Sequence, residues 1–144
     1  MLIVEAIRAQ LADTAGVIAL AGDRVYHGAR PQNDAVPAVA FEELPGGESY
    51  QDMTAGSVGV AVMPIQVNCY AEDALDAHTL REACRLALQN WINADMGMTG
   101  SPLSGGVHVW CCIFTGMSGG YEPETNNYVR SIDFDVHYQQ PVSA

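Results

Sequence analysis

The closing stretch, residues 121–138, constrains the fold of this chain more than any other. From Tyr128 onward the side chains alternate between an apolar and a polar set. The apolar set is Tyr128, Ile132, Phe134, Val136 and Tyr138, and the polar set is Ser131, Asp133, Asp135 and His137. Because side chains on a strand repeat every two residues, the pattern predicts a strand with one dry face and one wet, acidic face. Such a strand needs sheet partners and a cover for its apolar side.

Two helices are predicted to supply that cover. Residues 2–15 carry a stripe of Ile3, Ile7 and Leu11 at helical spacing, and Gly16 is expected to end this helix before a short helical turn at 17–20. A longer helix is expected from Glu72-Asp73 to about Asn93, because acidic residues favour a helix N-terminus. Its apolar stripe comprises Ala77, Leu80, Cys84, Ala87, Leu88 and Trp91.

The remaining periodic segments predict strands. They are residues 38–44, 58–71 and 107–115, with 24–27 as a short strand or an extended link. The apolar phase changes at Met63-Pro64, which predicts a bulge there. Residues 116–120, with three glycines, are expected to form a flexible link. The fold class is therefore α+β: a mostly antiparallel sheet with two long helices packed on one face.

At 144 residues the chain is expected to form a single domain over 1–144, with flexible projecting loops near 45–57 and 95–106. Met53, Met96 and Met98 lie in these loops, and Met117 lies in the glycine-bearing link. Methionine is an adaptable contact residue, so Tyr50, Met53, Met96 and Met98 are candidates for subunit or partner contact. The alternative, that the methionines simply fill their loops, stays open.

The charge balance excludes several partners. The net charge is −11, and all six basic residues are arginines. An ordinary nucleic-acid binder or an anionic membrane surface as a partner is disfavoured, because both need basic protein surface. No apolar run approaches the roughly 20 residues that span a bilayer, and residues 1–8 do not resemble a signal peptide, so a cytoplasmic protein is expected. The acidity suits solubility, or a surface past which DNA moves without sticking.

No motif predicts a catalytic, metal or cofactor site. The four histidines lack metal-ligand spacing, and no Gly-x-Ser-x-Gly elbow lies between a predicted strand and a predicted helix. Cys69, Cys84, Cys111 and Cys112 are interpreted as reduced core thiols. Asp133 and Asp135 could bind a divalent cation, although a solvated acidic face is favoured. On a sheet lining a channel, they would act by repulsion. A small enzyme or ligand-binding domain using His108, His137 and Asp135 is the rival of a different class.

An ordered series of segments resembles one known family. The series is the helix at 2–11, Gly22-Asp-Arg-Val-Tyr-His27, Val36-Pro-Ala-Val-Ala-Phe41, Ile65-Gln-Val-Asn-Cys-Tyr-Ala71 leading into the long helix, and the closing strand with Tyr121-Glu-Pro-Glu-Thr125. Together they resemble the tail-completion, or tail-to-head joining, proteins of long-tailed bacteriophages and prophages. The resemblance covers residues 1–139, and loops 45–57 and 95–106 depart from it.

The resemblance implies a non-enzymatic protein of the virion neck, assembled in the host bacterial cytoplasm. Such proteins form a ring, expected to be a hexamer, that caps the tail tube and meets the head-completion or connector protein. DNA passes through the lumen without specific binding, and neither a cofactor nor a membrane is involved. Loops 45–57 and 95–106 would then lie at interfaces, and Asp133 and Asp135 would face the lumen. Another neck protein or a tail-tube subunit is the nearest alternative.

Overall fold

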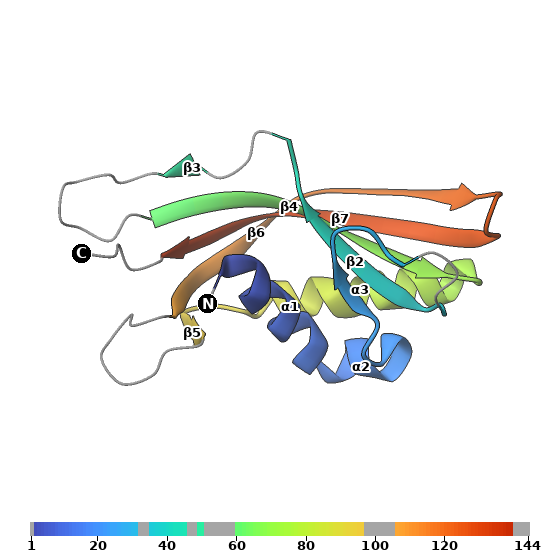
Figure 1. The fold of residues 1–144 in the computed structure, drawn as a ribbon, viewed down its shortest axis with the longest axis horizontal. Coiled ribbons are helices and arrows are strands. Elements are labelled where there is room, and N and C mark those ends of the chain that lie inside the picture. The colour runs from blue at the N-terminus through green and yellow to red at the C-terminus, as the bar shows by residue number, and fades with distance from the viewer. Residues whose placement is uncertain (1, 32–34, 46–48, 51–59, 97–105, 140–144) are drawn as a thin grey trace.

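The computed structural model describes residues 2–31, 35–45, 49–50, 60–96 and 106–139. Within them the chain forms a seven-stranded sheet and three helices, a mixed α/β architecture. Figure 1 shows the helices gathered on one side of the sheet. The helices are α1 (Ile3–Asp13), α2 (Ala15–Ala21) and α3 (Ala74–Gln89). The strands are β1 (Val25–His27), β2 (Ala38–Glu43), β3 (Ser49–Tyr50), β4 (Val60–Ala71), β5 (Ala94–Met96), β6 (Val107–Glu122) and β7 (Asn127–Gln139).

The sheet has the strand order β1-β2-β4-β7-β6-β5, with β3 paired to one end of β4. Among the described strands β1 and β2 pair in parallel, whereas the pairings β2–β4, β3–β4, β4–β7, β5–β6 and β6–β7 are antiparallel. Strands β4 and β7 are therefore central. Strand β1 lies at one edge, and most of β6 lies at the other because β5 is only three residues long.

The predicted alternation of the closing strand is confirmed. Ile132, Phe134, Val136 and Tyr138 are buried beneath the helices, on what we call the helix face of the sheet. Asp133 and Asp135 lie on the opposite side, the open face, and are half-buried. Ser131, expected on the wet face, is instead buried, because its hydroxyl donates to Asn68 Oδ1 of β4 at 2.6 Å.

The long helix is also confirmed, although it ends at Gln89. Its buried stripe is Ala77, Leu80, Cys84, Ala87 and Leu88, and Trp91 is buried just after it. Asp73 caps it, since its carboxylate accepts the Leu75 N–H at 3.0 Å. None of the described helices has the length and hydropathy needed to span a membrane.

The expectation that Gly16 ends the first helix is wrong. The described residues form three helices, and α2 contains the short helical turn predicted at 17–20. The chain breaks at Thr14, which is extended, and Gly16 lies inside α2. A Cβ at Gly16 would lie 3.3 Å from the Cβ of Ala83 in α3. Glycine is present here because the two helices approach closely, and the short α2 covers β2 beside the long α3.

The bulge predicted at Met63-Pro64 is wrong. Strand β4 alternates without interruption, and its pairing with β7 stays in register through Pro64. Pro64 lies just past the β2 ladder, where its carbonyl accepts the Leu44 N–H at 2.9 Å. Proline lacks a backbone N–H, and the loss of this hydrogen-bond donor costs little where the β2–β4 pairing has ended, so Pro64 is tolerated there.

Two expected connections contain strand. Residues 116–120, predicted as a flexible link, continue β6 as far as Glu122 and pair with β7. The predicted loop 95–106 begins inside β5, and loop 45–57 contains β3. The irregularity predicted for β4 is found in β6, whose register with β7 shifts between Val109 and Cys111 and again between Phe114 and Gly116.

Candidate functional site

The outer edge of β6 is open over most of its length. Strand β5 pairs only with Val107, His108 and Val109, and the Asn93 N–H donates to the Trp110 carbonyl at 3.2 Å. From residue 111 to residue 122 the strand pairs with β7 on one side, and no described strand pairs with its other side. In Figure 1 this part of β6 runs to the tight turn that leads into β7. An unpaired row of backbone donors and acceptors is a template for another strand.

Large apolar side chains accompany this open edge. Trp110, Ile113, Phe114, Met117 and Tyr121 are between 42% and 49% exposed. Ile113 lies opposite Asp135 on the open face, whereas Phe114, Met117 and Tyr121 lie opposite β7 residues of the helix face. An apolar edge with exposed side chains on both faces is typical of an interaction surface. We call residues 110–122 the β6 edge.

The opposite edge of the sheet is protected. The Val25 N–H of β1 donates to the Asp23 carbonyl at 2.9 Å, and the Val25 carbonyl accepts from Arg8 Nε of α1 at 3.1 Å. Strand β1 is also only three residues long. Short strands and capped backbone groups are usual devices against unwanted strand addition. The fold therefore closes one edge and leaves the β6 edge accessible.

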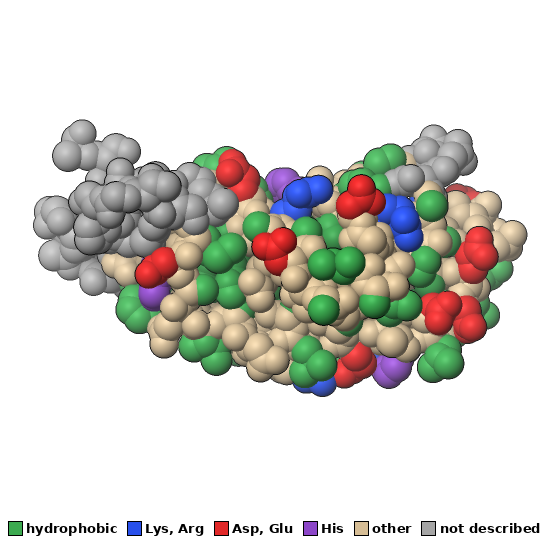
Figure 2. Space-filling view, turned by 90° about the horizontal axis from the view of Figure 1, so that it is seen from below, with side chains coloured by type: hydrophobic (Ala, Val, Ile, Leu, Met, Phe, Trp, Pro, Cys, Tyr) green, Lys and Arg blue, Asp and Glu red, His purple; other side chains and the backbone are tan. Residues whose placement is uncertain are grey.

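Among the described residues, the helix side of the molecule shows no comparable surface. Figure 2 shows its apolar side chains in small separate groups among polar and charged ones. Exposed residues such as Leu75 and Leu86 belong to this scattered set. Isolated apolar residues are normal on protein surfaces. The β6 edge is consequently the candidate site with the most consistent physical character.

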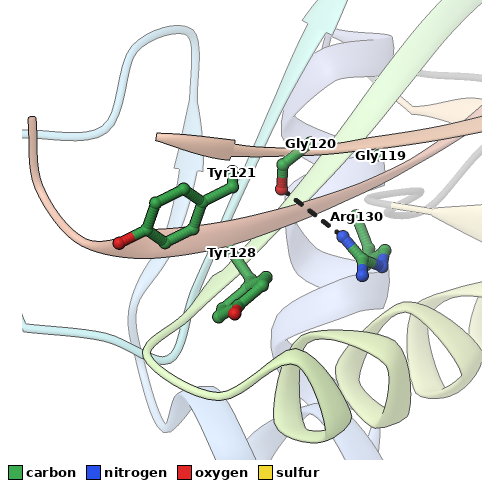
Figure 3. Close-up of a pocket in the computed structure, with 5 residues that line it drawn as sticks. All are labelled: Gly119, Gly120, Tyr121, Tyr128 and Arg130. Carbon is green, nitrogen blue, oxygen red and sulfur yellow. Dashed lines mark hydrogen bonds between the residues drawn. The ribbon is translucent and has the colours of Figure 1, made fainter. Parts of the chain in front are cut away.

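A shallow hollow of about 440 Å³ lies at the far end of the β6 edge, lined by Gly119, Gly120, Tyr121, Tyr128 and Arg130. Figure 3 shows both tyrosine rings and the Arg130 side chain around it. The ring centroids of Tyr121 and Tyr128 are 4.9 Å apart. Arg130 Nη1 donates to the carbonyls of Val129 at 3.0 Å and Gly120 at 3.4 Å. The hollow thus combines aromatic surface with a guanidinium group.

Of the four contact residues predicted from the sequence, two belong to strands and two lie outside the described residues. Tyr50 belongs to β3 by its backbone, but its side chain, like Met53 and Met98, lies outside the described residues. Met96 belongs to β5, where its side chain is half-buried and packs against the core. Asp133 and Asp135 lie opposite Gly116 and Ile113 of β6, so they border the β6 edge on the open face.

Sequence reasoning missed Arg130 and did not identify β6 as the strand that forms the open edge of the sheet. Arg130 occupies the apolar phase of the closing strand, between Tyr128 and Ile132, and a charged residue at such a position was the available signal. The β6 edge had no comparable signal, because strand order within a sheet is a tertiary property.

The residues of the enzyme alternative do not form a common hydrogen-bonded site in the described part of the chain. The ring of His108 pairs with Asp95 and packs edge-on against Trp110, with ring centroids 4.3 Å apart. His137 lies opposite Cys111, and Asp135 lies opposite Ile113. A search of the described residues finds no group of three His, Cys, Asp or Glu side chains that could hold a metal ion.

The buried thiols are held in their neutral form. Burial, with a smaller effect from Cys111, raises the pKa of Cys112 to about 12. A hydrogen bond with Cys84, whose sulfur is 3.8 Å away, and burial raise the pKa of Cys69 well above its ordinary value. A protonated thiol is a poor nucleophile and a poor metal ligand. These cysteines are structural.

The Cys112 thiol gives a prediction about alkaline stability. Below its ordinary pKa of 9.0 the thiol is protonated in both the folded and unfolded states, so it adds no pH dependence. Between pH 9.0 and about 12 the unfolded chain loses the proton and the folded chain keeps it, so unfolding becomes more favourable. We expect this thiol to lower the free energy of unfolding by about 1.4 kcal/mol per pH unit near pH 10–11.

Urea unfolding of the wild type and of Cys112→Ala across pH 8–11 measures this contribution. The variant is expected to lose less stability per pH unit than the wild type, whatever its stability at pH 8. Equal slopes for the two proteins would contradict the assignment of a raised pKa to Cys112.

Comparison with known proteins identifies a matching family and solved structures of similar fold. A family model described as tail completion protein gp17 matches residues 5–139. A solved chain from the virion of a native gene transfer agent particle superposes with a TM-score of 0.63 at 19% sequence identity, covering 92% of this chain and 91% of that chain. No curated protein matches the sequence. The solved chain shows that the fold occurs in a virion component.

Proposed function

Because the chain belongs to the family of tail completion protein gp17, a family of structural proteins of the phage tail, we propose that it forms a closed ring on the end of the tail tube. The ring is a hexamer that joins the tube to the head-completion or connector protein. DNA passes through its lumen without specific binding, and the protein catalyses no reaction. The solved virion chain of the same fold supports this role.

The single observation that carries the ring is the asymmetry between the two edges of the sheet. Arg8 caps the β1 edge, whereas the β6 edge keeps unpaired backbone and apolar side chains. A surface that meets a different surface of the next copy makes a heterologous contact, and such contacts close into rings when the rotation permits. The β6 edge is one half of that contact. This is the interface we assign to ring closure.

The charge of the chain fits the passage of DNA. A net charge of −11 repels a polyanion, so a lumen made from this chain would let DNA move without adhering. Asp133 and Asp135 are the residues we assign to the lumen, together with Glu42, which shares the open face with them. Tyr50, Met53, Met96 and Met98 remain proposed contacts with neighbouring copies, the tube protein or the connector protein.

Light scattering with negative-stain imaging of the same sample tests the ring. The purified chain, alone or mixed with purified tail tubes, is expected to show a mass of about six copies and images of a ring with a central hole. A chain that stays monomeric and leaves tube ends bare under both conditions would overturn the proposal. Rings with a different number of copies would support the proposed ring and contradict only the proposal that it is a hexamer.

A further inference from the structure

The hollow at the end of the β6 edge contains a guanidinium without an acidic partner in the described chain. Arg130 forms no salt bridge among the described residues, and its two hydrogen bonds go to backbone carbonyls. Its Cζ is 5.9 Å from the centre of the Tyr128 ring. By contrast, Arg85 is paired with Glu82 at 2.8 Å. Arg130 is thus positioned for a carboxylate from outside this chain.

Gly119 sets the course of the Arg130 side chain. A Cβ at Gly119 would lie 3.0 Å from Arg130 Cδ and 3.2 Å from its Nη1, so the arginine crosses the strand at a position without a side chain. At Gly120 a Cβ would have nothing within 4 Å. The arginine of β7 therefore lies against the backbone of Gly119 in β6. A residue with a side chain at position 119 would obstruct this course.

An added strand would place a side chain next to this arginine. Gly119 and Tyr121 lie opposite Arg130 and Tyr128 on the helix face. Neighbouring strands are about 4.8 Å apart, so a strand that pairs with the β6 edge opposite Gly119 faces glycine and, beyond it, the guanidinium. Specificity in strand addition comes from pockets for alternate side chains of the added strand. The hollow has the position of such a pocket.

We propose that the hollow binds an acidic side chain of a neighbouring copy of this chain, which enters as its backbone adds to the β6 edge. The inference rests on the proposed ring. Charge complementarity selects the occupant, because a chain with 17 acidic and six basic residues offers carboxylates to its neighbour. The tyrosine rings exclude water from the pair, and Arg130 offsets the repulsion between acidic copies at their contact.

Two variants and one matched control test the proposal. Arg130→Gln removes the charge and keeps the bulk of the side chain, and Arg85→Gln is the control at a paired arginine. Gly119→Ala places a methyl group against the Arg130 side chain. For each protein we would measure self-association by sedimentation, ring occupancy on purified tail-tube ends, and the unfolding midpoint.

Arg130→Gln is expected to weaken self-association and ring occupancy at least about tenfold, since a hydrogen-bonded charge pair contributes that much. Gly119→Ala is expected to weaken both in the same direction, while Arg85→Gln stays near the wild type. Added salt should reduce the difference between Arg130→Gln and the wild type.

If both Arg130→Gln and Gly119→Ala assemble as the wild type does, the hollow does not bind the neighbouring copy, whereas the proposed ring still stands. If the variants self-associate normally and lose only the binding to tube ends, the proposal is also wrong, because the acidic side chain in the hollow would then belong to the tube protein. A wild-type chain that assembles neither alone nor on tubes would overturn the ring itself. If Arg130→Gln does not fold, the self-association of Gly119→Ala relative to the wild type decides whether the hollow binds the neighbouring copy.

Discussion

Replacing both Ile113 and Met117 with lysine is expected to abolish ring assembly and leave the subunit folded. The two side chains are 49% and 44% exposed and lie on opposite faces of the β6 edge. In the ring each would bury its exposed part, which contributes about 1 kcal/mol per side chain. Burying two unpaired lysine ammonium groups instead of these apolar side chains costs roughly several kcal/mol more. Self-association should therefore weaken more than about a hundredfold.

The matched control is the double replacement of Leu75 and Leu86 with lysine. These leucines are 68% and 50% exposed on α3, in the scattered set of the helix side. Sedimentation of the two double variants at equal concentration compares them directly. The control should assemble as the wild type does. If the Leu75→Lys/Leu86→Lys control is monomeric and the Ile113→Lys/Met117→Lys variant assembles fully, the interface lies on the helices instead.

Replacing Phe134 with alanine is expected to lower the free energy of unfolding by about 3–5 kcal/mol. Phe134 is fully buried in the central strand β7, opposite Ile65 of β4 and Phe114 of β6. Its ring also packs edge-on against Phe114, with centroids 6.3 Å apart. The large effect follows because the rigid sheet cannot collapse around the lost ring.

Phe114→Ala serves as the comparison, since Phe114 is 42% exposed at the β6 edge. We expect it to cost about 1–2 kcal/mol, because only part of its ring is withdrawn from water. Both measurements belong in the monomeric Ile113→Lys/Met117→Lys background, where assembly does not add to the apparent stability. Equal losses for the two phenylalanines would contradict the assignment of β7 to the core and of β6 to an edge.

Elements with a buried face and a solvated face could be predicted from the sequence. The alternation that ends at Tyr138 and the stripe of α3 each leave a periodic pattern because one side contacts the core. Strand β6 leaves no such pattern beyond Cys112, since residues on both of its faces are exposed. Its glycines therefore indicated a link, although backbone pairing with β7 makes it a strand.

Local chemistry failed where tertiary contacts decide. Gly16 is a helix-ending residue by propensity, yet the proximity of Ala83 explains its place inside α2. Pro64 predicted a bulge, yet it lies where the β2 ladder has ended. Arg130 and its relation to Gly119 depend on the register between β6 and β7, which the sequence does not disclose.

Hydrogen exchange of the backbone amides of β6 is the decisive test of strand addition at the β6 edge. The assembled ring and the monomeric Ile113→Lys/Met117→Lys variant would be compared under the same conditions. Outward-facing amides between residues 111 and 122 are expected to exchange much more slowly in the ring, while those of β1 change little. Rings whose β6 amides exchange as fast as in the monomer would contradict strand addition at this edge.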